Sequence, residues 1–371
     1  MKQVIALKLT PSPEQFQALL ETVETFNRAC QYAAEIASHL SIFNKLALQP
    51  HVYGELRTRF GLSAQMAIRA IAKAVETCKR HPGEPFTFHP HGAMVYDERI
   101  LTFKGTSSVL IRALAGRILV PLQYGEYQAT RLKYIRGQAD LMLRDNVFYL
   151  YACIEISPAP PADKSDGILG VDLGIVTIAK DSMGNSYSGE KVKSVRRRMR
   201  RLRASLQKKG TRSARKHLAR IRRKQSRFVR NTNHCIAKHL VQTALDAKKA
   251  LALEDLTGIQ TQANGSSREI RWLLGNWAFS QLRQFITYKA QMAGISLQLV
   301  DPRNTSRTCS RCGYCDKFNR QSQSEFRCLQ CGLTLNADYN AALNIEARAA
   351  RSDSLLCRSD SLSERAQAVL A

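Results

Sequence analysis

Four cysteines in two close pairs constrain the fold of this chain more than any other feature of its sequence. Cys309 and Cys312 are separated by two residues, Cys328 and Cys331 repeat that spacing, and fifteen residues lie between the pairs. Each close pair fits a tight turn that presents two thiolates, and two such turns complete a tetrahedral zinc site. Four sulfur ligands leave no open position for water, so the pattern predicts a structural Zn²⁺ ion.

The surroundings of these cysteines support the same interpretation. Gly313 and Gly332 follow the second cysteine of each pair, where such a turn needs a permissive backbone. Cys315 offers an alternative ligand, although its three-residue spacing favours a spare thiol. The other five of the ten cysteines are scattered along the chain. Because a secreted disulfide framework would spread pairs along the chain, this cluster indicates metal binding in a reducing, cytoplasmic compartment.

The positive charge of the chain is also concentrated. The chain has 56 Lys and Arg against 30 Asp and Glu, a net charge of +26, and 19 of the basic residues fall between Lys191 and Arg230, where no acidic residue occurs. Such charge calls for a polyanionic partner, for which nucleic acid is the obvious candidate, and we expect association with the nucleoid. Charge runs also commonly form a solvated face or a disordered arm, but Leu and Ile at helical spacing favour two helices joined near Gly210. The basic residues that we expect to contact nucleic acid are Arg196, Arg197, Arg198, Arg200, Arg201, Arg203, Lys208, Lys209, Arg212, Arg215, Lys216, Arg220, Arg222, Arg223, Lys224, Arg227 and Arg230.

Membrane association is not expected. No stretch approaches 18 consecutive apolar residues, and the apolar run from Val4 to Leu7 is too short for a secretory signal. The chain is 44% hydrophobic over 371 residues, which is enough for a buried core and suggests two or three domains.

The N-terminal part is predicted to be one strand followed by helices. The apolar run over 2–9 predicts the strand. Ser12, Pro13 and Gln15 then mark a helix start, with Ser12 as the N-cap and Gln15 closing a capping box. A second helical stretch is predicted from about 63 to 78.

From 86 to 156 the pattern changes to short strands. Runs rich in β-branched and aromatic residues are separated by Gly, Asp and Asn, which predicts a small antiparallel barrel. Asp145-Asn146 lies between two of these runs and is a plausible hairpin turn. Proline-rich and polar residues over 157–167 then predict a linker, with a new domain beginning at Ile168.

Beyond the linker, strands alternate with helices, which is typical of a layered α/β domain. After 346 the periodicity is lost, and we expect a disordered tail over 347–371. The predicted strands and helices are Ile168–Asp172, Ile175–Ala179, the two basic helices, a helix containing Ile236, Leu240 and Ala244, Ala250–Glu254, Trp277–Ile286 and Leu297–Val300.

Three acidic residues stand in unusually apolar settings. Asp172 and Glu254 each end an apolar run, and Asp338 opens a predicted helix. In an α/β sheet functional groups gather at the carboxyl ends of strands, and converging carboxylates need cations, for which oxygen ligands favour Mg²⁺ or Mn²⁺. Simpler roles also fit these residues: Asp172 as a turn cap, Asp338 as an N-cap and Glu254 as half of a salt bridge.

Four motifs in order resemble the TnpB family, the RNA-guided nucleases of bacterial insertion sequences that are related to type V CRISPR effectors. The similarity covers about 1–346 and is most specific in the last third. The motifs are Gly170-Val171-Asp172-Leu173-Gly174, Leu253-Glu254-Asp255-Leu256, Thr305-Ser306-x2-Cys309-x2-Cys312-Gly313 and Asn336-Ala337-Asp338-Tyr339-Asn340-Ala341-Ala342-Leu343-Asn344-Ile345.

This resemblance implies a multidomain protein of mixed α+β and α/β class. A RuvC-like nuclease domain of RNase H fold would span 168–346, with a basic helical insertion at 191–230 and a zinc ribbon at about 305–335. A wedge-type β-barrel would span 1–156, with a helical recognition part, at about 12–80, inserted into it.

The resemblance also implies the site and the activity. The family's three metal-binding carboxylates fall on Asp172, Glu254 and Asp338, which would hold Mg²⁺ or Mn²⁺. The chain would be an RNA-guided DNA endonuclease that uses two metal ions, with a guide RNA from the transposon end and target double-stranded DNA as partners, and we expect a monomer. Two alternatives are a nuclease-inactive RNA-guided repressor, in which the acidic trio should be eroded, and a DNA transposase.

Overall fold

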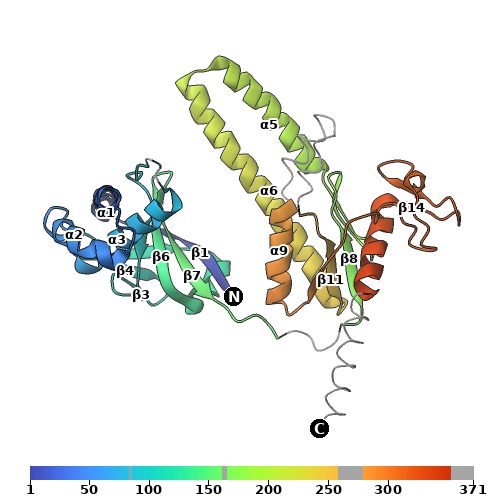
Figure 1. Cartoon of the computed structure of the whole chain (residues 1–371), viewed down its shortest axis with the longest axis horizontal. Helices are drawn as coiled ribbons and strands as arrows, with labels where there is room; N and C mark the ends of the chain where they lie inside the picture. Colours follow the sequence, from blue (N-terminus) through green and yellow to red (C-terminus); the bar gives the residue numbers. More distant parts are fainter. Residues whose placement is uncertain (83, 85, 161–164, 258–278, 352–371) are drawn as a thin grey trace, which may run out of the picture. The chain divides into compact units, whose positions relative to one another are not determined.

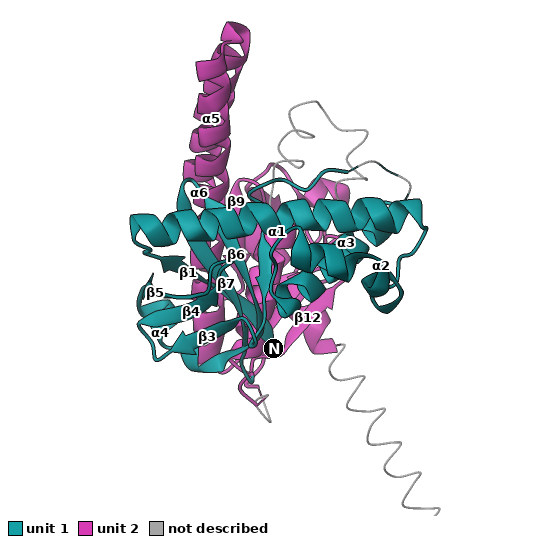
Figure 2. Ribbon diagram, turned by 90° about the vertical axis from the view of Figure 1, so that its left-hand side faces the viewer, with its two compact units in different colours: residues 1–157 teal, residues 158–371 magenta. Residues whose placement is uncertain are grey.

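The computed structural model describes residues 1–82, 84, 86–160, 165–257 and 279–351. The chain divides into two compact units, Met1–Ser157 and Pro158–Ala371 (Figure 2). The boundary falls where the predicted linker begins. Each unit is described by itself below.

The first unit is built on one antiparallel sheet of seven strands with the order β2-β6-β7-β1-β5-β4-β3. Asp145 and Asn146 connect β6 to β7 with φ angles of 51° and 62°. Both residue types tolerate the left-handed conformation that a tight hairpin requires, so the predicted turn is confirmed. The sheet is curled, so that β2 at one end of the strand order comes close to β4 near the other end. The Tyr96 hydroxyl on β2 donates a hydrogen bond to the Arg112 carbonyl on β4. The strands are β1 (Lys2–Leu9), β2 (Met94–Tyr96), β3 (Leu101–Lys104), β4 (Ser108–Arg112), β5 (Arg117–Gln123), β6 (Ile135–Arg144) and β7 (Val147–Glu155), with the short helices α4 (Glu126–Ala129) and η1 (Leu132–Tyr134) between β5 and β6.

Three helices separate β1 from β2: α1 (Pro13–His39), α2 (Lys45–Thr58) and α3 (Ala64–Arg80). The capping box of Ser12 and Gln15 at the start of α1 is confirmed. Helix α2 was not predicted, because its apolar pattern is weak and Pro50 stands inside it. Helix α1 packs on the sheet, where the rings of Phe16 and Phe148 lie 5.0 Å apart, and Figure 2 shows α1 along the sheet with α2 and α3 near one end.

The second unit contains a mixed sheet of five strands with the order β10-β9-β8-β11-β12. Neighbours β10, β9 and β8 are antiparallel, whereas β8, β11 and β12 run parallel. The predicted strands at these positions are confirmed within a few residues. Their bounds are β8 (Ile168–Asp172), β9 (Thr177–Asp181), β10 (Ser186–Ser188), β11 (Ala250–Glu254) and β12 (Leu297–Val300).

Helices cover both faces of this sheet (Figure 1). Leu169, Val171, Leu251 and Leu253 face one side, where they pack against α6 (Arg212–Asp246) and α9 (Phe279–Met292). Ile168, Ala250, Ala252 and Val300 face the other side, where they pack against Ile345 and Ala349 of a helix over 337–351. The alternation of strand residues between two covered faces explains why β8 and β11 are apolar runs.

The basic segment forms α5 (Glu190–Lys209) and the first part of α6, joined at Gly210 with a φ of 64°. Figure 1 shows the two helices as a long antiparallel hairpin. The separate helix expected around Leu240 is instead the continuation of α6, because no Gly or Pro interrupts 212–246.

The remaining described residues include η3 (Lys317–Asn319) and the small hairpin of β13 (Glu325–Arg327) and β14 (Thr334–Asn336). The predicted disorder from 347 is wrong for 347–351, which continue the last helix and bury Ala349. Trp277, part of the linker and the tail from 352 lie outside the described residues. Among the described helices, none combines the length and the apolar character that a membrane crossing requires.

Candidate functional site

Two of the three predicted acidic side chains end neighbouring parallel strands. Asp172 is the last residue of β8 and Glu254 is the last residue of β11. The strands pair in register, with Val171 opposite Leu253, so the two carboxylates lie at the same edge of the sheet. Glu254 is only 7% exposed. The carboxyl ends of parallel strands are where α/β sheets commonly carry their functional groups.

The third acidic residue reaches this edge from the helix over 337–351. Asp338 lies in its first turn, and its side chain is 12% exposed. The helix crosses β8 at Gly170, where an added Cβ would lie 2.2 Å from the Ala342 carbonyl oxygen and 2.5 Å from the Glu346 nitrogen. Any other residue would therefore force the helix away from the strand, so Gly170 fixes how closely Asp338 approaches β8.

The three carboxylates interact electrostatically. Burial raises the pKa of the Asp172 carboxyl well above its ordinary value, and the charges of Glu254 and Asp338 raise it further, whereas Arg320 acts against this rise. Burial also raises the pKa of Glu254, although a hydrogen bond from the Thr305 hydroxyl favours its charged form. Crowded, buried carboxylates of this kind carry full charge only when cations accompany them.

Arg320 is the component of this site that the sequence did not reveal. Its Nη2 lies 3.6 Å from Oδ1 of Asp338, and its side chain is 30% exposed. The carbonyl oxygens of Ser322 and Gln323 accept hydrogen bonds from the same guanidinium. The positive charge of Arg320 also offsets part of the rise in the pKa of both Asp172 and Glu254. It is one of many arginines in the sequence, so no residue pattern could single it out.

Two asparagines attach the segment before the cysteines to the helix that carries Asp338. Asn344 donates from Nδ2 to the carbonyls of Thr305 (2.8 Å) and Thr308 (2.7 Å). Asn340, one turn earlier, donates to the Thr308 carbonyl (2.8 Å) and accepts from the Ser310 N–H (3.0 Å). Because Thr305 contacts Glu254, these bonds place Glu254 and Asp338 through one connected network.

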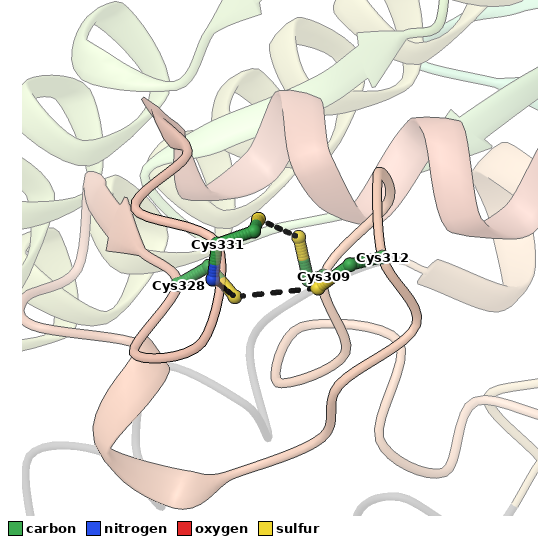
Figure 3. A group of neighbouring side chains, drawn as sticks. All are labelled: Cys309, Cys312, Cys328 and Cys331. Carbon is green, nitrogen blue, oxygen red and sulfur yellow. Dashed lines mark hydrogen bonds between the residues drawn. The ribbon is translucent and has the colours of Figure 1, made fainter.

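The four predicted cysteines form a compact group (Figure 3). Sγ of Cys309 lies 3.6 Å from Sγ of Cys331, and Sγ of Cys312 lies 3.6 Å from Sγ of Cys328. The four sulfur atoms, which are the potential metal ligands, all lie within 4.8 Å of one another. Four sulfurs at this spacing could bind a zinc ion. The exposed Cys315 is not part of the group.

The turns of the cysteine group have the expected form. Gly313 and Gly332 have φ angles of 77° and 71°, and their N–H groups bond to the carbonyls of Cys309 and Cys328. Burial acts to raise the pKa of the Cys328 thiol, but hydrogen bonds from backbone N–H groups and from the Cys312 and Cys331 side chains together bring the pKa to about 7.

The predicted nucleic-acid contacts lie on the α5–α6 hairpin. Met199, Leu206, Ala214 and Ile221 form a small core between the helices, which leaves the basic side chains on the outside. Of the seventeen basic residues, all but Arg196 and Arg203 are exposed. The hairpin therefore presents a large cationic surface of the kind that binds phosphate backbones.

Two family models match this chain. The model described as “Probable transposase” matches residues 151–257, and the model described as “Cas12f1-like, TNB domain” matches residues 279–345. The first match includes Asp172 and Glu254, and the second includes the four cysteines and Asp338.

Individual relatives agree with these models. A CRISPR-associated endodeoxyribonuclease Cas12f1 of Sulfoacidibacillus thermotolerans is 31% identical over 254 residues, covering 64% of this chain and 57% of the relative. A TnpB-like protein of Methanocaldococcus jannaschii is 34% identical over 122 residues, covering 33% of this chain and 43% of the relative. The chain spans about half the length of the curated relatives that it matches. The resemblance predicted from the motifs is confirmed.

A solved structure shares the fold. The chain matches the protein in a cryo-EM structure of a Cas12f1–sgRNA–target DNA complex with a TM-score of 0.64 at 13% identity, covering 93% of this chain and 98% of the other. The mixed α/β, multidomain fold is therefore shared with a type V effector.

Proposed function

We propose that this chain, a relative of the TnpB-like and Cas12f proteins, is an RNA-guided DNA endonuclease of a bacterial insertion sequence. The observation that carries the proposal is the gathering of Asp172, Glu254 and Asp338 at one edge of the five-stranded sheet. The mixed order of that sheet, with helices on both faces, supports a RuvC-like domain of RNase H fold. The curled sheet of the first unit, with three helices inserted after β1, supports a wedge-type barrel carrying a helical recognition part.

The three carboxylates would hold Mg²⁺ or Mn²⁺. Their oxygens are the donors that these ions prefer. The pKa of Asp172 is raised by burial and by the charges of Glu254 and Asp338, and a bound cation would offset both effects. Two such ions would supply Lewis-acid stabilisation and an activated water for hydrolysis of a phosphodiester bond, releasing a 3′ hydroxyl.

The protein's own groups prepare the site for this chemistry. Thr305 orients the Glu254 carboxylate through its hydroxyl, and the network of Asn340 and Asn344 keeps Thr305 in place. Arg320 is exposed enough to reach solvent while its guanidinium stays beside Asp338. A planar guanidinium is suited to a phosphate oxygen, so Arg320 would hold the scissile phosphate at the carboxylates.

The partners would be a guide RNA from the transposon end and target double-stranded DNA, bound by a monomer. The exposed cationic surface of the α5–α6 hairpin supports binding of nucleic acid. Base pairing with the guide would read the target sequence, while the protein would contact backbone and shape.

The test of the proposal is cleavage by the purified chain with its co-expressed flanking transcript. A DNA library with randomised flanks is incubated with Mg²⁺, and cleaved molecules are sequenced. Cuts at sites that match the transcript support the proposal. Guide-dependent DNA binding without cuts would instead indicate a repressor, and joining of labelled transposon ends would indicate a transposase.

Replacing Arg320 by Ala is expected to slow cleavage about 10²-fold to 10³-fold, which is typical for loss of one charged group that stabilises the transition state. Binding of guide RNA and target should stay the same. Single-turnover cleavage at saturating protein measures the effect, and Arg320→Lys should recover part of the rate. Arg327→Ala, an exposed arginine of β13 in the same subdomain, is the control. Equal cleavage rates for Arg320→Ala and the wild type would show that Arg320 does not contribute to cleavage at this site.

The cysteine group would hold a structural Zn²⁺ ion. Elemental analysis of the purified chain should find one zinc per molecule, and Cys328→Ser should lose the zinc and lower soluble yield and melting temperature, because metal binding and folding are coupled. Cys315→Ser should keep both, since Cys315 lies outside the group. A Cys328→Ser variant of normal stability and no zinc would contradict a structural role.

A further inference from the structure

A pocket of about 470 Å³ lies on the first unit, between α1, the residues that follow α2 and the turn that joins β4 to β5. Its volume falls within the range of about 300–1,000 Å³ that is typical of sites for small ligands. The lining positions 21, 25, 28, 32 and 35 of α1 recur every three or four residues, so they share one face of that helix. One long helix therefore supplies most of the pocket.

Backbone contacts hold the other walls against α1. The Leu114 N–H in the β4–β5 turn donates to Oγ1 of Thr22 at 3.1 Å. After α2, Gly61 adopts a φ of 63°, and the Leu62 N–H donates to a carbonyl in the last turn of α2 at 3.2 Å. These features close the end of that helix in a defined conformation. The pocket is therefore formed by fixed backbone on all sides.

Two aromatic rings and one guanidinium form the flat surfaces of the pocket. The rings of Tyr32 and Phe60 have their centroids 5.7 Å apart and are inclined at 43° to each other. The guanidinium carbon of Arg59 lies 5.6 Å from the first centroid and 5.4 Å from the second. Both rings are partly exposed, and Arg59 is exposed. Aromatic faces and guanidinium planes are the surfaces on which unpaired nucleobases stack.

The formal charges of the pocket cancel, which distinguishes it from the basic α5–α6 hairpin. Glu21 and Glu35 contribute two negative charges, and Arg28 and Arg59 contribute two positive charges. The pocket therefore offers no net attraction to a phosphate group, although the chain carries a net charge of +26. A neutral, flat ligand with polar edges suits it better, because such a ligand enters without the cost of desolvating a charge.

Polar groups beside the rings can bond to the edge of such a ligand. Nη2 of Arg28 donates to Oγ1 of Thr25 at 2.9 Å, and Nε2 of Gln31 donates to Oε1 of Glu35 at 2.9 Å. These bonds orient the guanidinium and the carboxylate, and each group has further donor or acceptor positions. Carboxylates accept hydrogen bonds from the amino groups of bases, and guanidiniums donate to their carbonyl oxygens and ring nitrogens. A nucleobase therefore matches both the flat surfaces and the polar groups of the pocket.

We propose that this pocket binds one unstacked base of the guide RNA. The proposal rests on the proposed function, which supplies the RNA partner, and deepens it by assigning one base to a site on the first unit. Loops, bulges and ends of RNA present unstacked bases, whereas a base of duplex DNA must first leave the helix at a cost in free energy. A base held in the pocket fixes the position of the transcript on this unit.

The first test compares two tyrosines that each lie beside an arginine. Tyr32→Ala removes one ring of the pocket, whereas Tyr32→Phe keeps it. The control is Tyr127→Ala in α4, an exposed tyrosine outside the pocket with the Arg131 guanidinium 3.8 Å from its ring centroid. Tyr32→Ala should lower affinity for the transcript about fivefold to 100-fold, the range for loss of one base stack. Tyr32→Phe and Tyr127→Ala should change it less than about twofold, and melting temperatures show whether each variant is folded.

Salt dependence separates a base from a phosphate as the bound group. Because the pocket is neutral, the slope of log affinity against log salt should be the same for Tyr32→Ala as for the wild type. Loss of a phosphate contact reduces that slope by about one, as expected for Arg198→Gln, an exposed arginine of α5. A reduced slope for Tyr32→Ala would contradict the binding of a base.

The second test identifies the base. Transcripts that each carry one abasic nucleotide are titrated against the wild type, Tyr32→Phe and Tyr32→Ala. At one unpaired position, removal of the base should weaken binding to the first two proteins and have no further effect on Tyr32→Ala, because both changes remove the same contact. The same scan on single-stranded DNA serves as the comparison.

The outcomes separate this inference from the nuclease proposal. Absence of such a coupled position in the transcript, or its presence only in the DNA strand, would overturn the base pocket even if the chain cuts DNA at guided sites. A coupled position in the transcript of a chain that does not cut DNA would support the base pocket and reject the endonuclease.

Discussion

Replacing Asp172 by Asn is expected to abolish DNA cleavage by the RNA-loaded protein while leaving RNA binding intact. A metal ion that acts as a Lewis acid contributes several kcal/mol to the transition state, and each 1.36 kcal/mol corresponds to a factor of ten. Loss of the central carboxylate should therefore slow cleavage by at least about 10³-fold. Single-turnover cleavage of a matched target with Mg²⁺ measures the rate.

The same substitution should stabilise the metal-free protein. A gain in stability together with a loss of cleavage would show that Asp172 serves function rather than folding. The pKa of Asp172 is higher in the folded chain than its ordinary value, so the folded state holds its proton over a pH range in which the unfolded state has lost it. The free energy of unfolding then falls as pH rises through that range. Asparagine carries no charge, and this fall should be smaller in Asp172→Asn without metal.

A suitable control is Asp255→Asn, which neutralises the acid next to Glu254. Asp255 pairs with Arg283 at 2.8 Å, and its side chain is 45% exposed. Its loss should change cleavage only a few-fold. Loss of RNA binding together with cleavage in Asp172→Asn would indicate misfolding and would contradict the role assigned to this carboxylate.

Replacing Gly170 by Ala should impair both cleavage and stability, although Gly170 carries no functional group. The added Cβ would lie 2.2 Å from a backbone oxygen of the helix over 337–351. Backbone atoms cannot rotate away, so the helix must move by about 1 Å to restore ordinary contact, and Asp338 moves with it. A displacement of about 1 Å at a reacting group can cost about 10²-fold in rate, and overpacking of this kind typically costs about 1–3 kcal/mol in stability.

The measurement combines cleavage with thermal melting. Gly54→Ala in α2 is the control, because nothing lies within 4 Å of its added Cβ, and it should be neutral or slightly stabilising. Gly170→Ala should cleave slowly even at temperatures where it is fully folded, and higher Mg²⁺ should recover part of the rate. Wild-type cleavage by a folded Gly170→Ala chain would show that close packing of this helix does not position Asp338.

Much of the fold could be predicted from short stretches of sequence, because helix caps and tight turns depend on interactions between residues only a few positions apart. The capping box at Ser12 and the hairpin at Asp145 depend on side chains within three positions, and both are confirmed. The buried strands β8 and β11 were visible as apolar runs. Helix α2 was missed because the sequence around its buried Leu48, Val52 and Leu56 shows only a weak apolar pattern and contains an internal proline.

The candidate site was only partly predictable, because its remaining components depend on tertiary contacts. Strand ends and apolar surroundings pointed to Asp172 and Glu254. Nothing near Arg320 in the sequence indicates that the chain after Cys315 folds back and brings its guanidinium to Asp338.

Crystals of the chain soaked in Mn²⁺ provide the most direct test of a shared metal site. An anomalous-difference map should show manganese at the edge of the sheet, in contact with the carboxylates of Asp172, Glu254 and Asp338, and the peak should vanish in Asp172→Asn. Manganese bound elsewhere, or a wild-type map without density between these three side chains, would contradict the account.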